Sequence, residues 1–61
     1  MKQFTSKQFS EMPRPAKSAL LIECIENINT NQIIEIDGVE ISQLSEFVSW
    51  LLNNIWYYMI Q

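Results

Sequence analysis

Histidine is missing from this chain of 61 residues, and cysteine and glycine occur only once each. Without histidine, the chain lacks the usual general base near neutral pH and the commonest metal ligand. Cys24 alone cannot form an internal disulfide or assemble a structural zinc site. A single glycine, Gly38, excludes a glycine-rich loop for binding phosphate. We therefore expect no enzymatic activity, no catalytic residues, no cofactor, no metal ion and no small-molecule ligand.

Basic residues are scarce and confined to one end of the chain. All four lie within the first 17 positions, and six acids with no base follow from Ser18 onward, for a net charge of -3. Nucleic-acid binding requires a basic surface, which only the first third of this chain could supply. DNA binding is therefore the alternative function, and its candidate contacts are Lys7, Arg14 and Lys17.

Long apolar runs of the kind that cross membranes are also absent. The most apolar stretch, 44–60, has about 17 residues and contains Glu46, Asn53 and Asn54, whereas a bilayer core needs ~20 apolar residues. No amino-terminal segment pairs a basic region with an apolar one, so we expect no signal peptide. These features, with a single unpaired Cys24, predict a cytoplasmic protein without a membrane partner.

Two short helices are predicted ahead of a hairpin. Thr5 followed by Gln8 fits a capping box, so the first helix should begin at Ser6. The two prolines should end this helix, because proline lacks an N–H and restricts the residue before it. A second helix is predicted from Ala16 to Ile28, with Pro15 in its first turn. Its predicted core-facing stripe consists of Leu20, Leu21, Ile22, Cys24, Ile25 and Ile28.

A β-hairpin over about 32–41 is the sharpest local prediction. Asp-Gly at positions 37 and 38 favours a two-residue type I′ turn, which sets the register of the flanking strands. Two strands alone are rarely stable in water, so Lys2–Phe4 is a candidate further edge strand. The face predicted to pack on the helices consists of Ile34, Ile36, Val39 and Ile41.

The same register places Glu35 opposite Glu40 on the other face of the hairpin. Like charges that face each other across strands are mildly destabilising, so the pair invites a cationic neighbour. Three interpretations stay open: a solvated face, a surface for a basic partner, or a catalytic or metal-binding pair. The first is the simplest, and the second would make these glutamates an acidic partner face.

A long helix is predicted over about 43–60, with Ser42 as its N-cap. Its core-facing stripe should comprise Leu44, Phe47, Val48, Leu51, Leu52, Ile55 and Met59. A second apolar surface remains, since rigid aromatic rings off this stripe need covering. That surface could be a self-association interface, which we favour, a site for another protein, or part of the protomer's own core. The predicted interface consists of Trp50, Asn53, Trp56, Tyr57 and Ile60.

The length of the chain points the same way. Sixty-one residues make one small domain, 1–61, near the lower limit for folding without disulfides, metals or partners. A second copy that covers the aromatic helix would stabilise such a domain. The predicted architecture is therefore a single α+β domain, with two helices, a hairpin and a long helix, that forms a homodimer.

The order of these elements resembles the N-terminal domain of Phd/YefM-type antitoxins. The resemblance rests on a short strand, a Thr-Ser cap, helices carrying Phe9, Lys17 and Leu20, the hairpin QIIEIDGVEI and the helix opening LSEF. It implies a symmetric dimer, which in that family binds operator DNA. The family usually has basic residues at the hairpin, where this chain has Asp37 and glutamates. In size and acidity the chain is also similar to small phage-encoded inhibitors of host defence enzymes.

These observations predict a small acidic homodimeric protein-interaction module that binds and inhibits or titrates another protein. The basis is an acidic chain, an excess of apolar side chains on the last helix and the lack of catalytic residue types. The alternative is an antitoxin-like DNA-binding autoregulator.

Overall fold

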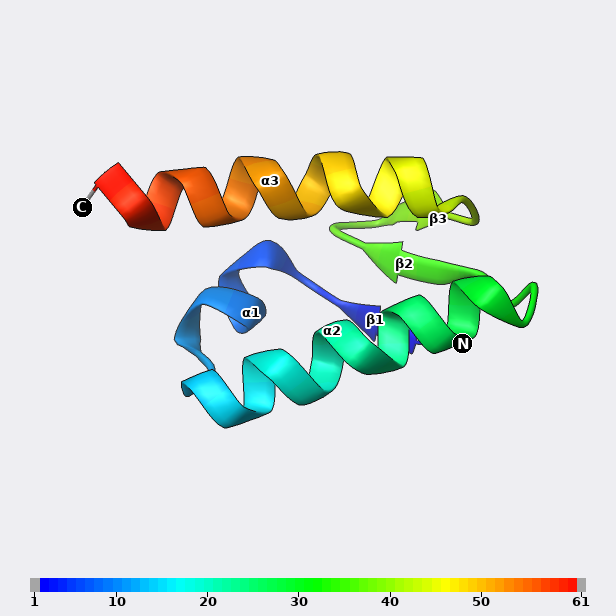
Figure 1. The fold of residues 1–61 in the computed structure, drawn as a ribbon, viewed down its shortest axis with the longest axis horizontal. Coiled ribbons are helices and arrows are strands. Elements are labelled where there is room, and N and C mark those ends of the chain that lie inside the picture. The colour runs from blue at the N-terminus through cyan, green and yellow to red at the C-terminus, as the bar shows by residue number, and fades with distance from the viewer. Residues whose placement is uncertain (1, 61) are drawn as a thin grey trace.

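The computed structural model describes residues 2–60, with side chains described from Lys2 to Asn54. The chain has an α+β fold, which confirms the predicted class (Figure 1). The predicted pair of helices, the hairpin and the long final helix are all present. In chain order the elements are β1 (Lys2–Phe4), α1 (Ser6–Glu11), α2 (Arg14–Asn29), β2 (Ile34–Ile36), β3 (Val39–Ile41) and α3 (Leu44–Ile60).

The three strands form one sheet in the order β1-β2-β3. β2 and β3 are antiparallel, and Glu35 pairs with Glu40 as the predicted register requires. Asp37 and Gly38 both have positive φ, 55° and 80°, which is the geometry of the predicted type I′ turn. β1 is an edge strand, as predicted, and it runs parallel to β2 with Phe4 beside Ile36.

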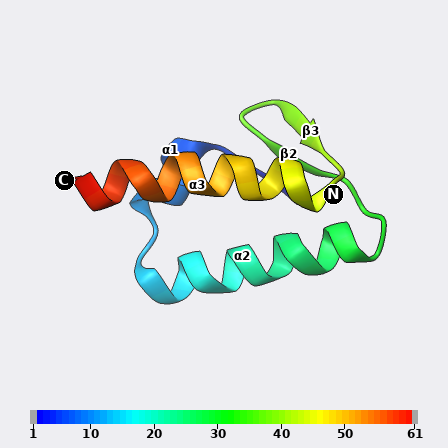
Figure 2. The ribbon, with the colours of Figure 1, turned by 45° about the horizontal axis from the view of Figure 1, so that its top comes forward.

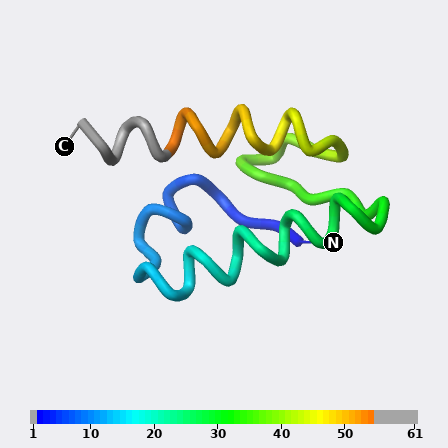
Figure 3. The backbone as a smooth tube through the Cα atoms, in the orientation of Figure 1, coloured from blue at the N-terminus to red at the C-terminus, as the bar shows by residue number. Residues whose placement is uncertain are grey.

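One face of the sheet carries the core. Side chains alternate along strands, and those of Phe4, Ile34, Ile36 and Ile41 are buried. α2 and α3 cover this face as two antiparallel helices, while α1 lies beyond the end of β1 (Figures 1 and 2). A single residue in extended conformation, Thr5, joins β1 to α1 (Figure 3). The buried core comprises Phe4, Phe9, Leu20, Cys24, Ile28, Ile34, Ile36, Ile41 and Phe47.

Val39 departs from the prediction for the hairpin. It was expected to pack on the helices with the three isoleucines, but its side chain is 61% exposed. The reason is its place on the edge strand next to the turn, where an open groove separates β3 from α3. The predicted packing of Val39 is therefore wrong, and its exposed side chain becomes part of a groove described below.

α2 begins two residues earlier than predicted, at Arg14, with Pro13 as its N-cap and Pro15 within its first turn. Only part of the predicted stripe is buried, namely Leu20, Cys24 and Ile28. Ile22 and Ile25 are exposed, so their predicted burial is wrong. A helix seated on a three-stranded sheet buries one narrow stripe, and these two side chains lie to one side of it.

α3 begins at Leu44, and the Gln43 carbonyl accepts the N–H of Phe47 at 3.2 Å. Gln43 is therefore the N-cap, and the predicted cap at Ser42 is wrong by one residue. Phe47 faces the core and is 1% exposed. The predicted partners of Phe47 on the core stripe, Leu44, Val48 and Leu52, are exposed, so that prediction is also wrong. Ile55 and Met59 lie outside the residues whose side chains are described.

The Cys24 thiol is fully buried, and burial raises its pKa to about 11. Only the thiolate reacts with alkylating reagents, and a free thiol ionises near pH 8.5. At pH 8 we therefore expect iodoacetamide to modify the folded protein at least ~100-fold more slowly than the denatured chain. Mass spectrometry over time measures both rates, and equal rates would contradict this environment for Cys24.

Candidate functional site

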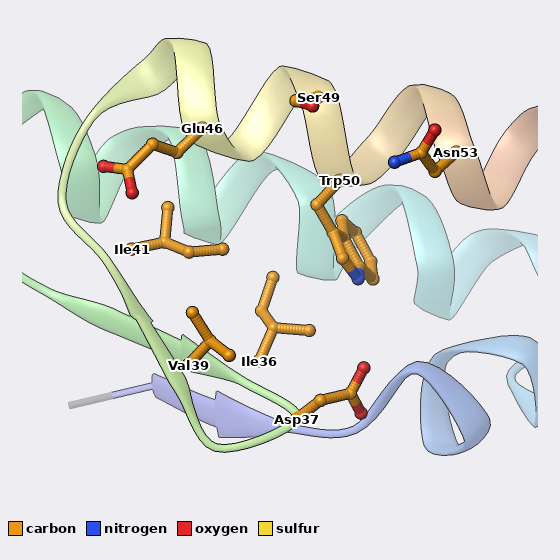
Figure 4. A pocket seen from close by; sticks show the side chains of 8 residues that line it. All are labelled: Ile36, Asp37, Val39, Ile41, Glu46, Ser49, Trp50 and Asn53. Carbon is orange, nitrogen blue, oxygen red and sulfur yellow. The ribbon is translucent and has the colours of Figure 1, made fainter.

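An open groove of about 420 Å³ runs between β3 and α3. Its floor is apolar, and polar side chains stand on both sides (Figure 4). Hydrophobic floors with a few placed polar groups are typical of binding sites. The groove is lined by Ile36, Asp37, Val39, Ile41, Glu46, Ser49, Trp50 and Asn53.

Trp50 connects this groove to the core. Its indole packs edge-on against the rings of Phe4 and Phe9, with centroids 5.7 and 5.2 Å away, and stacks on Phe47 at 5.8 Å. The indole N–H donates to the Ser6 hydroxyl at 3.0 Å. Trp50 was predicted to lie off the core-facing stripe, and that prediction is wrong. A large ring that fits among three phenylalanines buries more area than Leu44 or Val48 would, and this sets the rotation of α3.

Asp37 does more than shape the hairpin turn. Its carboxylate accepts the Ser6 backbone N–H at 2.8 Å and also the Ser6 hydroxyl. These hydrogen bonds, led by that of the hydroxyl, hold the pKa of Asp37 below its ordinary value of 3.8. Because Ser6 is the first residue of α1, Asp37 supplies an acceptor to the start of that helix. The series Trp50, Ser6, Asp37 thus joins α3, α1 and the hairpin turn.

The predicted acidic pair lies on the far side of the sheet from the helices. Glu35 and Glu40 face each other across β2 and β3, as expected from the register. The Gln3 side chain donates to Glu35 at 3.4 Å, and Glu40 is exposed on the edge strand. Neither glutamate lines the groove, whose carboxylates belong to Asp37 and Glu46. A partner face at Glu35 and Glu40 stays a prediction.

The basic residues gather elsewhere. Lys7 is on α1, Arg14 opens α2, and the Lys17 ammonium lies 5.5 Å from the centre of the Phe9 ring. Lys2 forms a salt bridge of 2.6 Å with Glu23, whose hydrogen bond raises the pKa of Lys2. No base lines the groove, in the part of the chain that the structure describes. The predicted nucleic-acid contacts therefore lie around the corner between α1 and α2, and their role stays a prediction.

The predicted interface on α3 is only partly visible. Trp50 and Asn53 both line the groove, so the structure brings these two together. Trp56, Tyr57 and Ile60 lie outside the residues whose side chains are described. The groove also contains Val39 and Glu46, which the sequence did not point to. Val39 was assigned to the core, and a glutamate in the first turn of a helix is ordinarily explained by the helix dipole.

A second exposed surface lies on the helices. It consists of five uncharged aliphatic side chains that are 37–61% exposed, and we call it the helical face. Its members are Ile22 and Ile25 of α2 and Leu44, Val48 and Leu52 of α3. On α3 the spacing of four residues aligns the three side chains along one flank.

The two halves of the helical face lie toward each other. On α3, the groove residues Glu46 and Asn53 mark the flank that faces β3, and the helical face occupies the opposite flank. On α2, Glu23 reaches Lys2 of β1, so the flank carrying Ile25 faces away from β1 and toward α3. Since α2 and α3 run side by side (Figure 2), Ile25 and the three side chains of α3 lie on the flanks that border the seam between the helices, while Ile22 lies further round α2.

Known proteins offer no guide to either surface. Comparison with protein-family models, with curated proteins and with solved structures found no match. Within the described residues, no group of three or more His, Cys, Asp or Glu side chains could hold a metal ion. No helix in that same part of the chain combines the length and apolar character needed to cross a bilayer.

Proposed function

We propose that this protein is a homodimeric protein-interaction module that acts by binding and blocking or titrating another protein. The observation that carries the proposal is the helical face, where five aliphatic side chains of one small domain are left in water. Exposed apolar groups that adjoin one another mark interaction sites far more often than single exposed ones do. We assign self-association to this face.

The size of the helical face suits a second copy. Its exposed fractions together equal the area of between two and three whole side chains. Covering that area would stabilise each copy by roughly 4–7 kcal/mol, at ~1.5–3 kcal/mol per side chain. Both copies contribute in a symmetric dimer, which brings the total into the range of the ~4–15 kcal/mol that association costs.

Charge also favours self-association at this face. Each chain carries a net charge of -3, so two copies repel wherever acidic surfaces meet. The helical face contains no charged residue; Glu23 pairs with Lys2 and Glu46 lines the groove on the opposite flank. Glu26 follows Ile22 by one turn and borders the face. The helical faces of two copies can therefore pack against each other with the carboxylates at or beyond the edge of the contact.

The second part of the proposal, inhibition or titration of another protein, draws on the composition of the chain and on its resemblances. A symmetric dimer is what the likeness to Phd/YefM-type antitoxins implies, and small acidic phage-encoded inhibitors act by binding host enzymes. Such a protein needs a surface for its target besides the dimer contact. The groove between β3 and α3 lies on the flank of α3 opposite the helical face and would stay open in the dimer.

A pair of aspartate substitutions at adjacent positions tests the dimer. Leu52→Asp places a charge in the helical face and should halve the mass measured by light scattering across a wide range of concentration. Asn53→Asp adds the same charge one residue further on, on the groove flank, and should leave the mass at twice that of the chain. Both positions are exposed, so each variant should keep the helical circular-dichroism spectrum of the wild type.

Two results would contradict the assignment. A wild-type protein with the mass of one chain at every concentration would remove self-association altogether. A dimer that survives Leu52→Asp and dissociates with Asn53→Asp would move the contact to the groove flank.

A further inference from the structure

We propose that the groove and the free edge of β3 bind an extended, basic segment of a partner protein, which adds a fourth strand to the sheet. The groove lies on a different flank of α3 from the self-association contact, so binding there does not depend on that contact.

The edge of β3 is open to another strand. β3 pairs only with β2 in the three-stranded sheet of the described chain. In a hairpin with a two-residue turn, Ile36 and Val39 form the hydrogen-bonded pair next to the turn, so the next pair does not exchange hydrogen bonds. The backbone N–H and C=O of Glu40 therefore point away from β2, toward the position of a fourth strand. An unpaired strand edge is a template for such pairing.

The groove lies where side chains of that added strand would go. Its floor is the helix-facing side of the sheet, with Ile36, Val39 and Ile41, and its wall is the outer flank of α3. Every second side chain of a strand added beside β3 points to this face of the sheet. Those side chains would enter the groove beneath α3. Val39, 61% exposed, would be covered by an aliphatic neighbour of its own kind.

The charges at the groove select a basic segment. Asp37 and Glu46 stand at opposite ends of the apolar floor (Figure 4), and Glu40 projects from β3 on the other face of the sheet, beside the position of the added strand. No base lines the groove in the described part of the chain, and all four bases belong to the first 17 residues. Asp37 keeps its charge while bonded to Ser6, because those hydrogen bonds stabilise the carboxylate form. In a segment that alternates aliphatic residues with lysine or arginine, the aliphatic side chains would enter the groove and the cations would lie beside Glu40 on the other face of the sheet.

A second copy of the chain suits this site less well. Pairing β3 with β3 across a two-fold axis would bring two Glu40 side chains and both groove rims together. Like charges directly opposite one another destabilise a strand pair, and the -3 charge of each chain adds to the repulsion.

The probe is a short synthetic peptide in which lysine and valine alternate, titrated by calorimetry and by amide NMR shifts at Val39 and Glu40. Binding should weaken as salt is added, because partly exposed charges are screened. A matched peptide of glutamate and valine should not bind. A lysine–valine peptide with methylated backbone nitrogens should not bind either, since it cannot donate to Glu40.

Variants locate the site. Glu40→Gln should weaken binding of the lysine–valine peptide roughly threefold to tenfold, because it removes a charge beside the lysines. Glu11→Gln, the same change at the exposed end of α1, should have no effect. Val39→Lys should weaken binding at least ~10-fold, because it places a like charge on the groove floor. Val39 is exposed on an edge strand, so that variant should fold.

Three results would overturn the proposal: no binding of the lysine–valine peptide, equal binding of the glutamate–valine peptide, or undiminished binding of the methylated peptide. Binding that Glu40→Gln and Glu11→Gln weaken equally would place the peptide elsewhere on the acidic surface and would also overturn it. Suppose that the wild type is a dimer, that Val39→Lys turns it into a monomer and that Leu52→Asp does not. The groove and the edge of β3 would then bind a second copy of the chain, and the proposal of a basic partner segment would be wrong. Binding of the lysine–valine peptide by a monomeric Leu52→Asp variant would support the groove as a peptide site. It would do so even if the proposed self-association of the wild type is not observed.

Discussion

Replacing Trp50 by alanine is expected to lower the free energy of unfolding by about 3–5 kcal/mol, the usual cost of removing a large aromatic from a packed site. The indole contacts three phenylalanine rings, those of Phe4, Phe9 and Phe47, which come from β1, α1 and α3. A domain of 61 residues has a total stability of roughly 3–9 kcal/mol, at ~0.05–0.15 kcal/mol per residue. The substitution should therefore remove at least about a third of that stability.

Urea denaturation followed by circular dichroism measures this loss. Trp50→Phe keeps an aromatic ring but removes the donor to the Ser6 hydroxyl, and it should cost less, about 1–2 kcal/mol. Ser45→Ala, at an exposed position of the same helix, should change stability by no more than ~0.5 kcal/mol. A Trp50→Ala protein as stable as the Ser45→Ala protein would show that the ring cluster does not hold α3 to the sheet.

Asp37→Ala is expected to lower the free energy of unfolding by about 1.5–4 kcal/mol. Two effects add: α1 loses an acceptor at its first turn, worth about 0.5–2 kcal/mol, and alanine must adopt the left-handed conformation, at about 1–2 kcal/mol. Asp37→Asn keeps one acceptor oxygen and tolerates the positive φ, so it should cost less than half as much. Glu40→Ala, an exposed position of the same hairpin, is the matched control.

The pH dependence separates the charge of Asp37 from its shape. Its pKa is lowered in the folded protein, so the folded state favours the carboxylate, and this stabilisation is fully present above the ordinary pKa of 3.8. It is lost as the pH falls below 3.8 through the lowered folded value. The stability difference between wild type and Asp37→Asn should therefore shrink between pH 5 and pH 2. A difference that stays constant over that range would mean that the Ser6 hydrogen bonds do not depend on the charge.

The hairpin could be predicted because its determinants are local. Asp37 and Gly38 set the turn, and the turn sets the pairing of every residue on β2 and β3. The capping box at Thr5 and Gln8 is local in the same way, and both of its hydrogen bonds are present. These elements could therefore be predicted from a few neighbouring residues, without reference to the rest of the chain.

The rotation of α3 could not be predicted from its own sequence. Apolar residues occupy most of its circumference, so periodicity alone allows several faces to turn inward. The rotation of α3 depends on the packing of the Trp50 ring against Phe4 and Phe9, which lie more than 40 positions earlier in the chain. For this one reason, the predictions that Leu44, Val48 and Leu52 face the core and that Trp50 lies off the core-facing stripe were wrong.

The candidate sites show the same limit. Trp50 and Asn53 were assigned to an interface and do line the groove, but the groove exists only because β3 and α3 come together. The hydrogen bonds between Ser6 and Asp37 join residues 31 positions apart, and no short motif announces them. Exposure of Ile22 and Ile25 likewise depends on which side of α2 faces the sheet, and exposure of Val39 on the groove between β3 and α3.

The parallel pairing of β1 with β2 bears on how this chain folds. Position 2 pairs with position 34, so the amino-terminal strand closes a loop of about 30 residues, whereas the hairpin closes across two. Hairpins form in about 1–10 μs, and contacts distant in sequence form more slowly. We expect β1 to be the last strand to dock, bringing Ser6 to Asp37 in the same step. During synthesis, β1 leaves the ribosome before β2 and must therefore wait for its partner strand to emerge.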